Sequence, residues 1–288
     1  MYLGSPEAAV PPLVALVRAG IEVPLVVSRP DRRRGRGGAT SPSPVKAAAL
    51  ELGLEVTSDV HAVTSVDADV GVVVAYGALL RPPVLGHLPL VNLHFSLLPR
   101  WRGAAPVERA ILEGDEETGV CVMAVEAGLD EGGVYRSVAL PIDPDESAEE
   151  LRGRLVTVGV EALLDCCTDG FGPPTAQVGV PTYAAKLTAD DRRLRWDASA
   201  VALHRVVRIG RAWTTFRGAR LLVHRARPCA APAGTSYAPA PGSHDGVVVA
   251  TGDGWLELGE VQPEGRGRLD ASAWLHGVRP GPDDRLGT

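Results

Sequence analysis

An asparagine and a histidine stand two residues apart at the end of an apolar run, Val91-Asn92-Leu93-His94. Residues two apart in a strand project from the same face, so both side chains would emerge where the strand gives way to a loop. Open α/β sheets bind their ligands at that edge. An amide donor beside a titratable imidazole can stabilise an oxyanion and move a proton. The pair therefore predicts a site for acid–base chemistry.

A carboxylate lies in a second glycine-rich segment, Gly128-Leu129-Asp130-Glu131-Gly132-Gly133. The segment joins two predicted strands, 119–125 and 134–140. Flanking glycines let the backbone approach a ligand closely and adopt positive φ angles. Placed beside His94, Asp130 could fix the tautomer of the imidazole and stabilise its protonated form. Each of these residues is also common in a purely structural role, so the prediction depends on their combination.

The surrounding sequence predicts the sheet that would hold these residues. Short Val/Leu runs at 22–28, 69–75 and 90–94 indicate strands that are buried on both faces. Helical patterns at 6–19, 42–54, 105–112 and 148–164 alternate with them. This order predicts a doubly wound, mostly parallel α/β sheet of the Rossmann type. We expect a catalytic domain over 1–172, a linker over 173–189 and a small C-terminal β-barrel of the OB type over 190–288.

Composition narrows the class of protein. The chain has 288 residues and a net charge of −6, and its arginine excess lies after residue 188. No apolar stretch is long enough to span a bilayer, and the N-terminus lacks a signal-peptide pattern. The four cysteines form no C-x-x-C pair and the histidines show no metal-ligand spacing. We expect a cytoplasmic, monomeric enzyme that uses no metal and binds neither DNA nor membranes.

Several short sequence motifs, taken in order along the chain, resemble those of a known family. Asn92-Leu93-His94-x-Ser96-Leu97-Leu98-Pro99, followed by Gly128-Leu129-Asp130, resembles the Asn-His-Asp signature of the 10-formyltetrahydrofolate-dependent formyltransferases. Further strings resemble the branch of that family that acts on methionyl-tRNA. They are Pro30-Asp31-Arg32 with Gly35-Arg36-Gly37 and Pro42-Ser43-Pro44-Val45-Lys46, Pro99 to Pro106, Glu116-x-Thr118-Gly119-Val120, Pro181 to Leu187, and Val261 to Gly265. The match covers nearly the whole chain.

The resemblance implies a function in translation initiation: formyl transfer from 10-formyltetrahydrofolate to the α-amino group of methionyl initiator tRNA. It assigns catalysis to Asn92, His94 and Asp130. It also assigns seven residues to the lining of the folate site, although leucines at such positions, as at 79, 80, 97 and 98, more often belong to an ordinary core. The seven residues are Ser96, Leu97, Leu98, Pro99, Tyr76, Leu79 and Leu80.

Two arginine groups are candidates for tRNA binding. A basic glycine-rich loop contains Arg32, Arg33, Arg34 and Arg36, and the resemblance places this loop at the acceptor end of the tRNA. After Gly37 the chain departs from the family pattern, where basic residues are common. On the predicted helix 197–209, Arg205 and Arg208 lie three residues apart and share a face. Such groups would pair with phosphates, although a solvated helix face is an equally ordinary explanation.

Three other functions remain open at this point. An N-formyltransferase acting on an amino sugar nucleotide would share the fold, the folate and the Asn-His-Asp set. A hydrolase releasing formate would replace the amine with water. A catalytically impaired relative would bind folate or RNA without turnover. The basic loop favours tRNA as the acceptor, and the intact Asn-His-Asp set favours an active enzyme.

Overall fold

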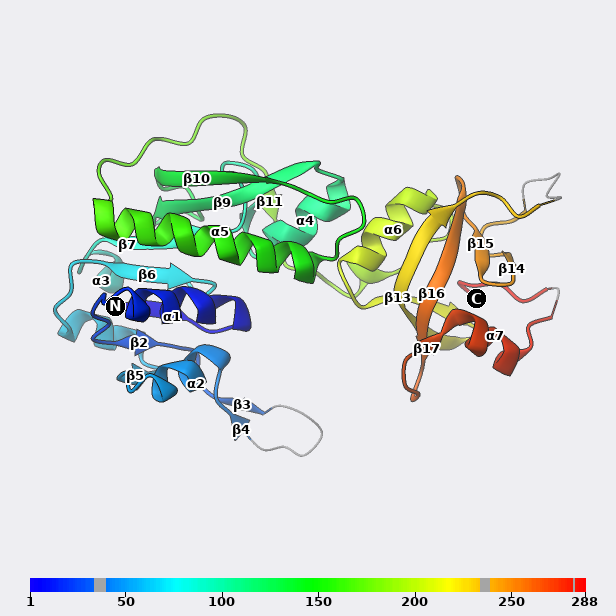
Figure 1. Ribbon diagram of the computed structural model, residues 1–288, viewed down its shortest axis with the longest axis horizontal. Helices are drawn as coiled ribbons and strands as arrows, with labels where there is room; N and C mark the ends of the chain where they lie inside the picture. The colour runs from blue at the N-terminus through cyan, green and yellow to red at the C-terminus, as the bar shows by residue number, and fades with distance from the viewer. Residues whose placement is uncertain (34–39, 234–238, 282) are drawn as a thin grey trace. The chain divides into compact units, whose positions relative to one another are not determined.

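The computed structural model describes residues 1–33, 40–233, 239–281 and 283–288 (Figure 1). The chain divides into two compact units. The first comprises 1–107, 116–142 and 150–186, and the second 108–115, 143–149 and 187–288. Residues 173–186 of the predicted linker thus pack with the first unit. The position of the domain boundary along the chain stays a prediction.

The first unit is built on a sheet with the strand order β10-β9-β7-β6-β1-β2-β5. Five neighbouring strands are parallel: β1 (Tyr2–Gly4), β2 (Val26–Val27), β5 (Val56–Thr57), β6 (Gly71–Val74) and β7 (Leu90–His94). At the other end of the sheet, β9 (Glu117–Ala124) pairs antiparallel with β7, and the edge strand β10 (Val134–Pro141) pairs antiparallel with β9. This confirms the predicted doubly wound, mostly parallel sheet.

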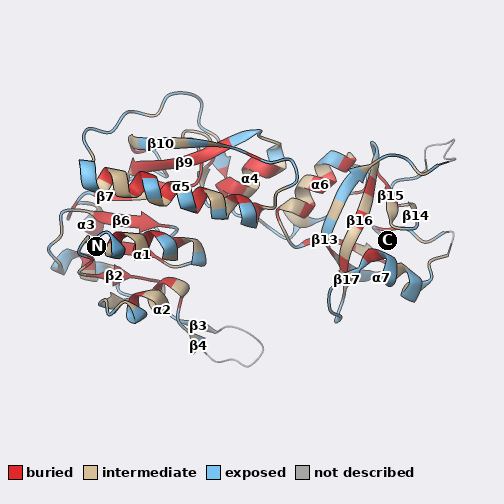
Figure 2. Ribbon diagram, in the orientation of Figure 1, coloured by how far each residue is buried: buried red, intermediate tan, exposed pale blue. Residues whose placement is uncertain are grey.

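Buried β-branched side chains explain the central strands. Every residue of β6 is buried, and β9 is buried over six consecutive positions (Figure 2). The helices of this unit are α1 (Val10–Arg18), α2 (Pro44–Glu51), α3 (Pro82–Leu85) and most of α5 (Ala148–Asp169), whereas most of α4 (Pro106–Glu113) belongs to the second unit. Ser43 caps α2 by accepting a hydrogen bond from the Lys46 backbone N–H at 3.0 Å, and Pro44 begins the helix.

Helix α5 supports the strand that carries His94. A Cβ added at Gly159 would lie 3.1 Å from Leu93 Cδ2, so the missing side chain lets α5 approach β7 closely. Arg136 of β10 also contacts Asp165 of α5, with 2.6 Å between Nη2 and Oδ2. Because close packing resists displacement, β7 presents its last residues from a rigid base.

Two short strand pairs also belong to the first unit. Strands β3 (Arg32–Arg33) and β4 (Thr40–Ser41) form an antiparallel pair. Strand β8 (Arg102–Gly103) pairs in parallel with β11 (Tyr183–Ala184). The pairing of β8 with β11 brings the segment after residue 173 against the loop that follows β7.

The second unit contains an antiparallel sheet in the order β12-β13-β16-β15-β14, with β17 paired to β16. Its strands are β12 (Ala212–Phe216), β13 (Ala219–Cys229), β14 (His244–Asp245), β15 (Val248–Ala250), β16 (Trp255–Pro263) and β17 (Leu269–Asp270). Helices α6 (Ala200–Arg208) and α7 (Ala271–Val278) belong to the same unit. Its core includes Trp196, Phe216 and Trp274. The predicted C-terminal β domain is confirmed.

Candidate active site

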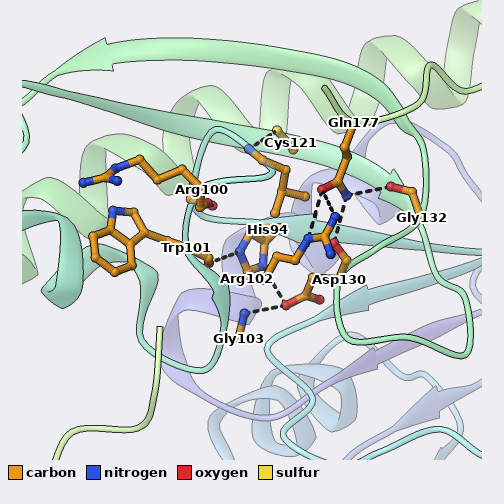
Figure 3. A network of polar contacts seen from close by, with 11 residues as sticks. His94, Arg100, Trp101, Arg102, Gly103, Cys121, Asp130, Gly132 and Gln177 are labelled. Carbon is orange, nitrogen blue, oxygen red and sulfur yellow. Dashed lines mark hydrogen bonds and ion pairs between the residues drawn. The ribbon is translucent and has the colours of Figure 1, made fainter. Parts of the chain in front are cut away.

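His94 is the last residue of β7 and is buried, with 6% of its surface exposed. Its Nε2 lies 2.9 Å from the backbone carbonyl oxygen of Trp101. A carbonyl oxygen only accepts, so Nε2 carries the proton of this bond. Nδ1 is left to face the carboxylate of Asp130, whose Oδ2 lies 3.7 Å away (Figure 3). The distance is within ion-pair range but longer than a hydrogen bond.

Asp130 lies in the loop between β9 and β10 and has a φ angle of +50°, in the left-handed region. Its carboxylate is 17% exposed and accepts a hydrogen bond from the Gly103 backbone N–H at 2.7 Å. A non-glycine residue in this conformation costs about 1 kcal/mol or more and persists only where the surroundings enforce it. The loop therefore holds the carboxylate toward His94 rather than toward solvent.

Asn92 is half-buried and lies opposite Val73 of β6 and Met123 of β9. By strand alternation its side chain projects from the same face as that of His94. Its carboxamide forms no hydrogen bond with any other residue that the structure describes. The amide is therefore available as a donor beside the His94–Asp130 pair.

The loop after β7 is fixed at several points. Ser96 Oγ donates to the Arg100 carbonyl at 2.6 Å, and the Leu98–Pro99 peptide bond is cis. The Leu98 backbone N–H donates to the thiol sulfur of Cys121 at 3.4 Å. Burial raises the pKa of that thiol, so Cys121 stays neutral and serves as an acceptor rather than as a nucleophile.

A cavity of about 300 Å³ lies at the carboxyl ends of β1, β2 and β6. Its lining includes Ser5, Arg29, Ser43, Tyr76 and Gly77. The hydroxyl of the lining residue Ser43 lies 2.5 Å from that of the buried Ser28. Parallel sheets bind ligands at this edge, beside the strand that ends in His94.

The predicted folate-site residues have different environments. Tyr76 and Leu80 belong to a buried core cluster, although Tyr76 also lines the cavity. Leu79 is 76% exposed. The side chain of Leu97 packs against Gly119 of β9, because a Cβ added at Gly119 would collide with it. The assignment of Ser96, Leu97, Leu98, Pro99, Tyr76, Leu79 and Leu80 to a folate site stays a prediction.

The predicted tRNA-binding arginines are also untested. Arg34 and Arg36 lie outside the described residues, and for Arg32 and Arg33 only the strand pairing is described. In the second unit, Arg205 donates to the Glu113 carbonyl at 3.4 Å. Arg208 donates to the carbonyls of Glu146 and Asp143 at 2.7 and 2.8 Å. These bonds give the two α6 arginines structural partners, and their contact with tRNA stays a prediction.

Three residues that the sequence motifs did not identify as site residues surround the His94–Asp130 pair: Gln177, Thr182 and Arg102. Thr182 Oγ1 accepts from the Trp101 backbone N–H at 2.9 Å. Gln177 bonds to the Asp130 loop. A lone glutamine in an extended segment carries no local signal, whereas Thr182 and Arg102 both lie within strings that resemble the family.

Comparison with known proteins identifies the family. Residues 5–167 match the formyl transferase family, and residues 186–279 match the formyl transferase C-terminal domain. A methionyl-tRNA formyltransferase of Acidothermus cellulolyticus is 40% identical over 99% of this chain and 99% of its own. One from Jannaschia sp. is 41% identical over 98% of this chain and 97% of its own.

A solved structure shows the same fold at low identity. It is the N-formyltransferase from Helicobacter canadensis in complex with folinic acid and dTDP-3-aminofucose. The TM-score is 0.68 at 13% identity, over 91% of this chain and 98% of that one. In the described parts of this chain, no group of three or more His, Cys, Asp or Glu side chains could hold a metal ion, and no helix is long and apolar enough to cross a membrane.

Proposed function

The chain belongs to the methionyl-tRNA formyltransferase family, and from that premise we propose that it transfers the formyl group of 10-formyltetrahydrofolate to the α-amino group of methionyl initiator tRNA. The observation that carries the proposal is the placement of Asn92, His94 and Asp130 at one edge of the sheet. His94 and Asp130 meet within 3.7 Å, and Asn92 shares a strand face with His94. Relatives about 40% identical over the full length support the choice of acceptor.

The reaction requires an oxyanion to be stabilised and a proton to be moved. The neutral amine of methionine attacks the formyl carbon, a C–N bond forms, and the formyl oxygen becomes an oxyanion. The amine then loses a proton, N10 of the folate gains one, and the bond between the formyl carbon and N10 breaks. No covalent bond to the protein is required.

We assign the oxyanion to the free amide of Asn92 and to Nε2 of His94. In the structure, that nitrogen donates to the Trp101 carbonyl, so it must exchange this acceptor for the substrate oxygen. Asp130 faces the other ring nitrogen and stabilises the positive charge when the imidazole is protonated. With Asp130 holding the ring, a water relays the proton from the amine to N10.

The substrates have candidate positions at the same edge. Tyr76 lines the cavity at the ends of β1, β2 and β6, which supports a folate site between that segment and the Ser96–Pro99 loop. The acceptor end of the tRNA would approach over the segment of 32–36. The arginines there would add an attraction to phosphates that weakens with salt.

Formyl transfer by the purified protein tests the proposal. One reaction contains 10-formyltetrahydrofolate and methionyl initiator tRNA, a second contains dTDP-3-aminofucose in place of tRNA, and a third contains no acceptor. We expect formyl-methionyl-tRNA in the first reaction, and none with His94→Ala. Product only in the second reaction would establish a sugar acceptor, and formate in the third would establish a hydrolase. Folate binding without product in any of them would indicate an impaired relative.

A further inference from the structure

The segment 175–184 is a strap that is hydrogen-bonded at both ends within the first unit. At one end, Thr175 bridges to Val134 of β10 through two backbone bonds of 2.8 Å. At the other end, β11 pairs with β8. Between them, Val178 and Val180 are each 86% exposed, whereas the side chain of Gln177 bonds to the Asp130 loop. The chain therefore turns one polar side chain toward the site and leaves apolar ones in solvent.

The carboxamide of Gln177 uses its full hydrogen-bonding capacity. Nε2 donates to the carbonyls of Asp130 and Gly132, each at 2.8 Å. Oε1 accepts from Nε and Nη2 of Arg102, at 3.1 and 2.8 Å (Figure 3). A primary amide has two donor hydrogens and two acceptor lone pairs, so all four are used. The arrangement also fixes the direction of the amide, because a flip would set its oxygen against two carbonyls.

Both loops that Gln177 joins contribute to the catalytic pair. Arg102 precedes Gly103, whose N–H binds the Asp130 carboxylate, and the side chain of Arg102 is only 11% exposed. Asp130 itself has the strained φ of +50°. Gly132 packs closely on β9, since a Cβ there would lie 2.0 Å from the Ala124 carbonyl oxygen. Gln177 thus connects the backbone at Asp130 and at Gly132, two residues further on, to Arg102, the residue beside the N–H that binds the carboxylate.

The strap contacts the histidine side of the pair as well. Thr182 accepts from the Trp101 N–H, and the Trp101 carbonyl accepts from His94 Nε2. Trp101 has a φ of +62°, a second left-handed residue held by this segment. One stretch of chain therefore restrains the backbone next to both His94 and Asp130.

We propose that Gln177 is a positioning residue, which sets the distance and direction of the Asp130 carboxylate relative to His94 and so controls the rate of the chemical step. This inference rests on the proposed function, in which Asp130 is catalytic. Gln177 acts through Asp130 and does not itself contact substrate. A misplacement of a catalytic group by about 1 Å costs about 100-fold in rate.

Steady-state and single-turnover formylation of Gln177→Ala and Gln177→Glu tests the proposal. Gln177→Glu keeps the shape and the contact with Arg102 but replaces the two donors with acceptors facing carbonyls. We expect kcat to fall about 10- to 100-fold in each variant, with KM for tRNA and for folate within about twofold of the unsubstituted chain. The neighbouring exposed residue supplies the control, and Val178→Ala should change neither parameter. Unchanged kcat in both Gln177 variants would overturn the proposal.

A double-mutant cycle distinguishes positioning from general loss of structure. In the background of Asp130→Asn, Gln177→Ala should change the remaining rate by less than about twofold, because the carboxylate it places is gone. If the two losses multiply instead, Gln177 acts independently of Asp130 and the inference is wrong. If Asp130→Asn alone leaves the rate unchanged, the proposed catalytic role of Asp130 is wrong. The single variant shows this by itself, so the result is distinguishable from a failure of the Gln177 proposal. A thermal melt of each variant confirms folding, and Gln177→Glu replaces Gln177→Ala if the latter unfolds.

Discussion

Removing the charge of Asp130 is the most direct test of the catalytic role that we propose for the His94–Asp130 pair. Asp130→Asn keeps the size of the side chain and an oxygen that can accept from the Gly103 N–H. The lost interaction is that of a carboxylate with imidazolium across 3.7 Å. It amounts to about 1 kcal/mol at the dielectric constant of water and about 4 kcal/mol at an effective value near 20. Because His94 is buried and Asp130 nearly so, the larger value applies more closely.

The expected consequence is a fall in kcat of about 5- to 1000-fold, since each 1.36 kcal/mol is tenfold in rate. KM for both substrates should stay nearly constant, because the charge matters only when the ring is protonated during the reaction. Single-turnover formylation with both substrates saturating measures the chemical step. Glu126 is an exposed carboxylate on the same loop, so Glu126→Gln is the matched control and should leave kcat and KM unchanged. A kcat within twofold of the unsubstituted chain would refute the assignment of Asp130.

Three further changes test other parts of the molecule. Asn92→Ala should lower kcat about 100- to 1000-fold in the same assay with little change in KM, as loss of an oxyanion donor does; a rise in KM alone would indicate ground-state binding instead. Arg36→Ala should raise KM for tRNA and reduce the salt dependence of that KM without changing folate affinity; unchanged values would remove the loop from tRNA binding. Asp191→Asn should lower the free energy of unfolding by about 2 kcal/mol at neutral pH. Burial raises the Asp191 pKa, but hydrogen bonds from Thr188 and contact with Arg109 outweigh it and lower the pKa from 3.8 to about 2. The difference between Asp191→Asn and the unsubstituted chain should therefore be full above about pH 5 and disappear as pH falls through about 2 in denaturant titrations; a difference independent of pH would contradict it.

The sequence predicted those parts of the site that depend on local periodicity. Val/Leu runs located β6 and β7, and the Asn92–His94 spacing placed two side chains on one face at a strand end. The loop between two antiparallel strands brought Asp130 to the same edge, because β9 pairs with β7 as well as with β10. In each case a pattern of a few residues was sufficient, since burial on one or both faces imposes it.

The contacts that hold His94 and Asp130 together could not be predicted from such local patterns. Trp101 and Thr182 are 81 residues apart in the chain, and Gln177 is 47 residues from Asp130. Strands β8 and β11 have two residues each, too few to show a period. For the arginines of α6, local spacing described only part of their environment. Their spacing predicted an exposed basic face, but burial lowers the pKa of Arg208 and its guanidinium bonds to backbone carbonyls.

The strap explains how two loops with strained residues can hold the His94 imidazole and the Asp130 carboxylate at a defined distance. Asp130 and Trp101 each have positive φ angles, and neither residue lies within a helix or strand that would enforce them. A third segment that bonds to both loops supplies the restraint, through Gln177 on one side and Thr182 on the other. In the proposed mechanism, His94 Nε2 releases the Trp101 carbonyl to reach a substrate oxygen. The restraint on Trp101 would then have to let this one bond exchange while the backbone stays in place. Substitution at Thr182 should therefore loosen the His94 side of the pair, whereas substitution at Gln177 should loosen the Asp130 side.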